Sequence, residues 1–217
     1  MAWVESSVVA YLRSLLGEIQ LHRPGSLPHL GILGTAEIIR EAATLLMLFS
    51  VGRLAGGTGR SRWAFSFLAF GIWDLFYYVF LIPLTGWPTS LLDWDILFLI
   101  PIPWWGPVLA PCCISILLVI GGGTVALFDR RENPLRPGRA AAIAGAAGTA
   151  LILYSFLATA LSAAAQGIQA VEHAVPERFP WPFFLAGCAL MAIPVLDVVR
   201  RVIRRESSGK ALSPGRD

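Results

Sequence analysis

Four polar residues recur at steps of three and four along one apolar stretch of the chain: Glu37, Arg40, Glu41 and Thr44. In a helix this spacing places all four on one face. The stretch from Leu30 to Gly57 is long and apolar enough to cross a bilayer, where an ionised side chain costs at least about 2.5 kcal/mol. Two carboxylates against one guanidinium leave a negative charge that a proton, a cation or another arginine must neutralise. The structural alternative is an arginine–glutamate pair that only holds helices together.

A second polar group lies at a matching depth in the next apolar stretch. Asp74 follows Trp73, and the hydroxyl groups of Tyr77 and Tyr78 come three and four residues later. Placed together, Asp74 and Glu41 could hold a cation, relay protons, or act as acid and base. A direct ion pair between Asp74 and the arginine of the first stretch is the structural alternative, and the two interpretations are compatible.

The following segment adds two more carboxylates. Ser90 and Asp93 have the spacing of a capping box, which predicts a structural role for Asp93 at a helix start. Asp95 lies two residues further on and therefore points to a different side. It is either a water-exposed residue at the rim or part of the lining of the site.

A metal ion is an open candidate cofactor. The candidate ligands combine the two mid-span carboxylates with a pair from a later loop: Glu41, Asp74, Glu172 and His173. Glu172 and His173 are weak support for a metal site, because the side chains of adjacent residues on a helix point in different directions. No histidine lies in the middle of an apolar run, which argues against haem or chlorophyll held between helices.

The composition places this chemistry in a membrane. Of the 217 residues, 56% are apolar and only 14% are charged, which is typical of a polytopic membrane protein. The formal net charge is +3, but the basic residues form short clusters beside apolar runs. That pattern orients membrane proteins and excludes nucleic acid as the partner.

We therefore expect an all-α bundle of five transmembrane helices. An amphipathic helix over residues 1–22 precedes it and lies in the membrane interface, with Glu5 and Ser6 on its polar side. The transmembrane bundle is assigned to residues 30–205 and a cytoplasmic tail to residues 206–217. The five spans cover about 31–54, 63–84, 105–128, 140–165 and 181–203.

Prolines interrupt the region between Pro83 and Pro111, so this region cannot be one straight helix. The pattern predicts a half-helix from about Leu91 to Ile100 and a proline-broken or re-entrant segment before the third span, covered by protein or water. In the fourth span, small residues four apart predict close contact with a neighbouring helix. The pairs are Ala144 with Gly148 and Gly145 with Thr149.

The distribution of lysine and arginine predicts the orientation. In the five-span arrangement thirteen of these residues fall on one side and three, Arg13, Arg23 and Arg178, on the other. The more basic side is the cytoplasmic one. The carboxyl terminus is therefore expected in the cytoplasm and the amino terminus outside.

Three strings, REAATLLML, WDLFYY and LLDWDILFLIPIPWWGPVLAP, lie between residues 37 and 111. Together they resemble a family of small, uncharacterised bacterial polytopic membrane proteins. The resemblance implies a bacterial inner-membrane location and transfers no activity.

These observations support three functional hypotheses. The first is an intramembrane site, open to the extracytoplasmic side, that binds a cation, a proton or a small polar or lipid headgroup. Its predicted residues are Glu37, Arg40, Glu41, Trp73, Asp74, Tyr77, Tyr78 and Asp95. The second is an accessory or assembly subunit whose charged stripe pairs with other membrane subunits. The third is a metal-dependent membrane enzyme acting on lipid.

Overall fold

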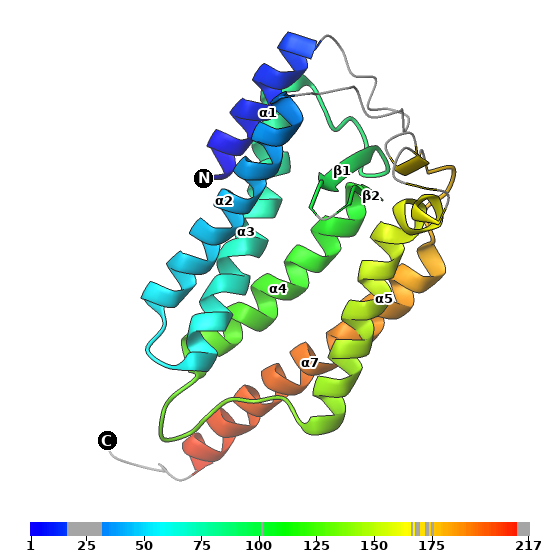
Figure 1. Ribbon diagram of the computed structural model, residues 1–217. Helices are drawn as coiled ribbons and strands as arrows, with labels where there is room; N and C mark the ends of the chain where they lie inside the picture. The colour runs from blue at the N-terminus through cyan, green and yellow to red at the C-terminus, as the bar shows by residue number, and fades with distance from the viewer. Residues whose placement is uncertain are drawn as a thin grey trace.

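The computed structural model describes residues 1–16, 32–100, 102–165, 167, 170–171, 174 and 176–211. Within these residues the fold consists of helices and one short hairpin (Figure 1). The helices are α1 (Ala2–Leu16), α2 (Ile32–Ala55), α3 (Gly59–Thr85), α4 (Leu109–Phe128), α5 (Arg139–Ala164) and α7 (Trp181–Ala211). The hairpin strands are β1 (Trp94–Phe98) and β2 (Trp104–Pro107).

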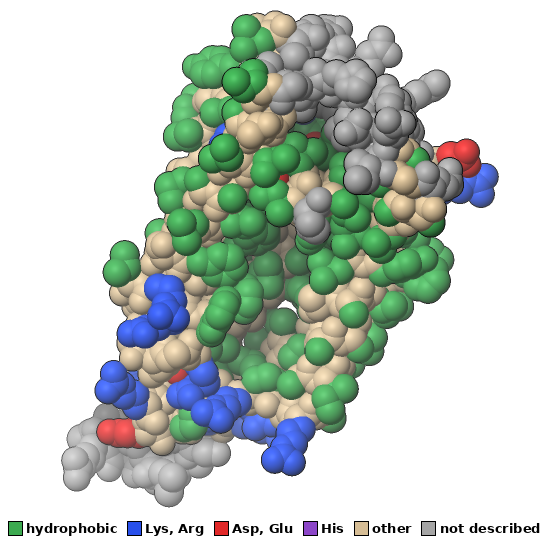
Figure 2. Space-filling model, in the orientation of Figure 1, with side chains coloured by type: hydrophobic (Ala, Val, Ile, Leu, Met, Phe, Trp, Pro, Cys, Tyr) green, Lys and Arg blue, Asp and Glu red, His purple; other side chains and the backbone are tan. Residues whose placement is uncertain are grey.

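Four of the helices, α3, α4, α5 and α7, are long and apolar enough to cross a membrane. Large apolar side chains cover the outside of the bundle, as Figure 2 shows, and Leu46, Leu54 and Leu127 are at least 70% exposed. Polar side chains such as Asp74 and Ser115 are buried instead. This distribution suits hydrocarbon as the solvent. The remaining predicted span, about 31–54, corresponds to α2, which carries four charged residues.

Helix α1 turns its polar side inward. The sequence predicts that Glu5 and Ser6 face the headgroup region, whereas the structure buries both of them. Val4 and Leu15, on the apolar side of the helix, are 62% and 75% exposed. Helix α1 packs beside α3, and the Ser6 hydroxyl donates a hydrogen bond of 2.9 Å to the Tyr77 carbonyl.

The predicted half-helix over Leu91–Ile100 is wrong, because its residues enter an antiparallel hairpin. Asp95 pairs with Gly106, and Phe98 pairs with Trp104 after a register shift. The strands are rich in tryptophan, isoleucine and phenylalanine, which favour extended backbone. The region does break between α3 and α4, as predicted, but strands rather than a helix fill it.

The helices form two close pairs, α3 with α4 and α5 with α7, which meet where α4 contacts α7. The close helix contact predicted for the small residues of the fourth span is confirmed. A Cβ atom added to Gly148 would lie 2.6 Å from the Gly187 carbonyl oxygen, and one added to Gly145 would lie 2.8 Å from Pro194. The two backbones therefore touch without an intervening side chain.

Replacing Gly148 should test this contact. We expect Gly148→Leu to lower the free energy of unfolding by about 1–3 kcal/mol, because the new side chain must push α7 away. Ala147→Leu is the matched control, since Ala147 is exposed on the same helix. Thermal unfolding in lipid nanodiscs measures both, and equal stability of the two variants would contradict the contact.

The end of the molecule opposite the hairpin is held by Asp129. Its carboxylate accepts hydrogen bonds of 2.9 Å from Nε of Arg60, 2.8 Å from the Thr58 hydroxyl and 2.9 Å from the Leu135 N–H. Burial alone would raise the pKa of Asp129, but these donors, with Arg60 first, hold it below its ordinary value of 3.8. One carboxylate thus joins α3 to the loop between α4 and α5.

This lowered pKa predicts acid sensitivity at that end. The ionised form stabilises the fold above the ordinary pKa, and the stabilisation is lost as pH falls through the folded pKa. Asp129→Asn should lower the melting temperature at pH 7, and the difference from the wild type should shrink as pH falls below 4. Melting curves between pH 7 and pH 3 measure this, and a difference that is constant with pH would contradict it.

Candidate functional site

The charged stripe of α2 faces α1 of the same chain. Arg40 forms ion pairs with Glu5 and, at 2.5 Å, with Glu37. The Thr44 hydroxyl donates to the other carboxylate oxygen of Glu5. Glu5 is 6% exposed, so its charge depends on these two donors.

Glu41 turns instead toward the hairpin. The Leu99 N–H, just beyond β1, donates hydrogen bonds of 3.1 and 2.9 Å to the two carboxylate oxygens of Glu41. The hairpin leaves the Leu99 N–H without a partner on the facing strand, and the Glu41 carboxylate provides the acceptor that this partly buried donor needs. Glu41 therefore joins α2 to the segment between α3 and α4.

Asp95 lies in β1 and faces α3. It accepts a hydrogen bond of 2.9 Å from the Tyr78 hydroxyl, and it is 6% exposed. Burial raises the pKa of Asp95 to about 6, although the Tyr78 hydroxyl and the charge of Arg13 act in the opposite direction. Asp95 is therefore not the water-exposed rim residue of the first alternative, and its place in the lining of a site stays a prediction.

Arg13 of α1 is the second guanidinium near this group. It lies 4.5 Å from the centre of the Trp87 ring and donates a hydrogen bond of 3.3 Å to the Thr85 hydroxyl. A guanidinium over an aromatic face is stabilised without a carboxylate partner. Its charge compensates Asp95 from a distance.

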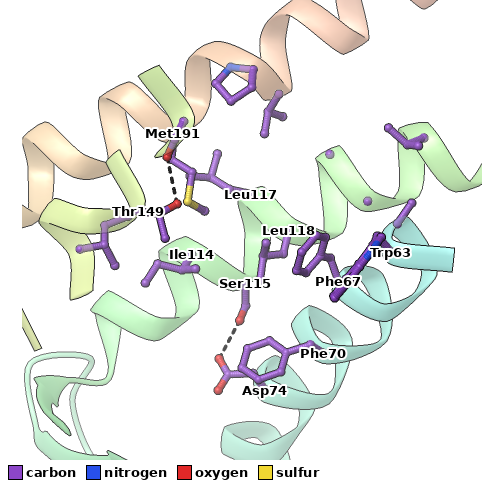
Figure 3. A pocket seen from close by; sticks show the side chains of 18 of the residues that line it. Trp63, Phe67, Phe70, Asp74, Ile114, Ser115, Leu117, Leu118, Thr149 and Met191 are labelled. Carbon is purple, nitrogen blue, oxygen red and sulfur yellow. Dashed lines mark hydrogen bonds between the residues drawn. The ribbon is translucent and has the colours of Figure 1, made fainter. Parts of the chain in front are cut away.

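Asp74 has a partner on a different helix. The Ser115 hydroxyl of α4 donates a hydrogen bond of 2.8 Å to Asp74, which is 8% exposed (Figure 3). The guanidinium of Arg40 pairs with Glu5 and Glu37 rather than with Asp74. The structure therefore does not contain the predicted alternative of an Arg40–Asp74 bridge.

Aromatic rings on one side of α3 connect these positions. Trp73 stacks on Tyr77 with ring centres 6.4 Å apart, and Tyr77 meets Tyr78 edge-on at 5.0 Å. Within the described residues, Nε1 of Trp73 is buried and has no hydrogen-bond partner. A row of aromatic rings thus runs along α3 beside Asp74 and the Tyr78–Asp95 pair.

The predicted residues fall into four hydrogen-bonded groups at the hairpin half of the bundle. One group contains Glu37 and Arg40, the second contains Glu41, the third contains Tyr78 and Asp95, and the fourth contains Asp74 with Ser115. The structure gives Glu41 and Asp74 separate partners. Glu172 and His173 lie outside the described residues.

Sequence reasoning missed three residues of this region: Glu5, Arg13 and Ser115. The signal for Glu5 was present, because Arg40 and Glu5 are opposite charges in segments that both contain helical apolar patterns. Ser115 gave no signal, since an isolated serine in an apolar run usually bonds to its own helix.

Among the residues that the structure describes, the charges of this region do not balance. Five carboxylates, Glu5, Glu37, Glu41, Asp74 and Asp95, accompany two guanidiniums, Arg13 and Arg40. If all were ionised, five negative and two positive charges would leave three negative charges in a poorly hydrated interior. Among the described residues no three His, Cys, Asp or Glu side chains converge as a metal site would need.

The fold and site together define a bundle of membrane-type helices with a carboxylate-rich interior. Comparisons with protein-family models, with curated proteins and with solved structures found no match to the chain.

The Arg40–Glu5 pair provides a test of the site's assembly. Arg40→Met should destabilise the protein by about 2–3 kcal/mol, because Glu5 is left charged and buried without its partner. Glu5→Gln combined with Arg40→Met should recover most of that loss. Arg53→Met, at an exposed position of α2, is the control.

Unfolding free energies of the single and double variants form a double-mutant cycle. Additive losses in the double variant would show that the two side chains do not interact.

Proposed function

We propose that the chain is a five-span integral membrane protein whose hairpin half binds protons, or a cation, at buried carboxylates. The observation that supports this function is the excess of five carboxylates over two guanidiniums among the described residues that lie between α1, α2, α3 and the hairpin. An uncompensated charge in the membrane interior is costly, so such a site takes up protons or a cation to approach neutrality.

Helix α2 is the fifth span in this proposal. It has 24 residues, about 36 Å of helix at 1.5 Å per residue, which is enough to cross the hydrocarbon core. Its charged residues Arg40 and Glu41 bind α1 and the hairpin, while Ile39 and Leu46 are exposed. The charges are thereby shielded from lipid.

The orientation follows from the basic end of the molecule. Arg131 donates a hydrogen bond to the Gly57 carbonyl, and Arg205 donates to the carbonyls of Asn133 and Pro134, so the basic loops and α7 meet at one end. We propose that this end faces the cytoplasm of a bacterial cell and that the carboxylate-rich half faces outside.

Proton binding fits the contacts better than coordination of a metal ion. Glu41, Asp74 and Asp95 each have their own hydrogen-bond donors, whereas a metal needs several oxygen ligands around one point. A metal-dependent lipid enzyme that uses Glu172 and His173 stays a prediction, because both residues lie outside the described parts of the chain.

The accessory-subunit hypothesis is the second candidate. It expects the charged stripe of α2 to pair with helices of other proteins. Arg40, Thr44 and Glu41 are instead engaged by α1 and the hairpin of this chain, so the stripe offers little charge to a partner.

Infrared spectroscopy of the protein in nanodiscs tests the proposal. Protonated carboxyl groups have a carbonyl band that carboxylates lack. We expect this band at neutral pH, weakened in both Glu41→Gln and Asp74→Asn, because each substitution removes one buried acid.

Glu132→Gln is the control, since Glu132 is exposed in the loop between α4 and α5, and it should leave the band unchanged. Loss of the wild-type band on adding Na⁺ or Ca²⁺ would identify the cation form of the proposal. Absence of both the band and any cation-dependent change would refute it.

A further inference from the structure

A large apolar cleft lies between the two helix pairs, at a distance from the Arg40–Glu5 group. Its volume is about 870 Å³, and Figure 2 shows the hollow between the two halves of the molecule. Figure 3 shows Phe67 and Phe70 of α3, Ile114 of α4, and Thr149 and Met191 on the opposite wall.

The cleft follows the membrane direction of the bundle. Asp74 and Arg60 both line it and are fourteen residues apart on α3, which corresponds to about 21 Å. The hydrocarbon of one leaflet is about 15 Å deep. The cleft is thus long enough for the extended acyl chains of a lipid.

One end of the cleft is basic. Arg60 and Arg136 both line the cleft there, and Figure 2 shows lysine and arginine gathered below the hollow. Arg60 binds Asp129 through Nε. Arg136 is exposed and has no ion pair among the parts of the chain that the structure describes. The Arg60–Asp129 pair is neutral, so Arg136 gives this end of the cleft a net positive charge.

We propose that the cleft binds an anionic phospholipid of the leaflet at the basic end, with its phosphate at Arg136 and its acyl chains between α3–α4 and α5–α7. Arginine suits phosphate because its planar N–H groups match two phosphate oxygens. A partner helix is the other conceivable occupant. The positive charge at Arg136 favours the lipid, because a spanning helix is apolar and carries no phosphate for this guanidinium to bind.

Two substitutions separate the headgroup contact from the acyl-chain contact. Arg136→Gln removes the guanidinium, and Arg139→Gln is its control at an exposed position that does not line the cleft. Thr149→Phe fills the cleft, because Thr149 points into it (Figure 3). Ala150→Phe is its control on the adjacent, exposed position of α5.

The experiment is native mass spectrometry of the full chain released from nanodiscs that contain equal amounts of phosphatidylglycerol and phosphatidylcholine. Wild-type protein should retain one phosphatidylglycerol in preference to phosphatidylcholine. Arg136→Gln should reduce that retention by at least about tenfold, as expected for the loss of a charged hydrogen bond. Thr149→Phe should remove retention of both lipids, and the two controls should match the wild type.

Equal retention of the two lipids by the wild type would overturn the proposal, as would undiminished phosphatidylglycerol in Arg136→Gln. A co-purifying protein that Thr149→Phe displaces would show a helix in the cleft and would also overturn it. Should Thr149→Phe fail to fold, Arg136→Gln still decides the result, because Arg136 is an exposed residue outside the helices.

Discussion

The pairing of Arg40 with Glu5 is the interaction on which the hairpin half of the molecule depends. A helix as charged as α2 can lie within an apolar bundle only if its charges meet partners there. Glu5 supplies the partner from α1, which explains why α1 presents a polar side to its neighbours. Arg40 pairs with Glu5, and Glu41 instead accepts hydrogen bonds from the hairpin segment. The charged residues of α2 therefore bind two separate segments, α1 and the hairpin.

The sequence predicted the helices well, because each long helix corresponds to an apolar run with basic residues near its end. The spacing of Glu37, Arg40 and Glu41 indicated that they share one side of α2, but not that Arg40 and Glu41 have partners in different segments. It did not reveal that Glu5 and Ser6 point inward. Periodicity shows which residues share a face but not which face meets water, and a lipid environment reverses the usual assignment.

The hairpin and the Asp74–Ser115 bond were beyond sequence reasoning for a different physical reason. Residues such as Trp94 and Phe98 suit both a short strand and a short helix, and the outcome depends on pairing with residues of β2 and on Glu41, far away in the chain. Asp74 was recognised as a buried acid in need of a partner. Nothing near it in sequence indicated that the partner is a hydroxyl on the next helix.

The contact between the hairpin and α5 limits how the two halves of the bundle can move. A Cβ atom on Gly106 of β2 would lie 2.7 Å from the Phe156 ring, so the hairpin is pressed against α5, while α4 touches α7 along one seam. The hairpin therefore joins the two helix pairs at one end, and Asp129 and Arg205 join them through the α4–α5 loop at the other end. With both ends joined, an occupant of the space between the pairs exchanges sideways through the open face of the cleft rather than past the buried carboxylates of the hairpin half.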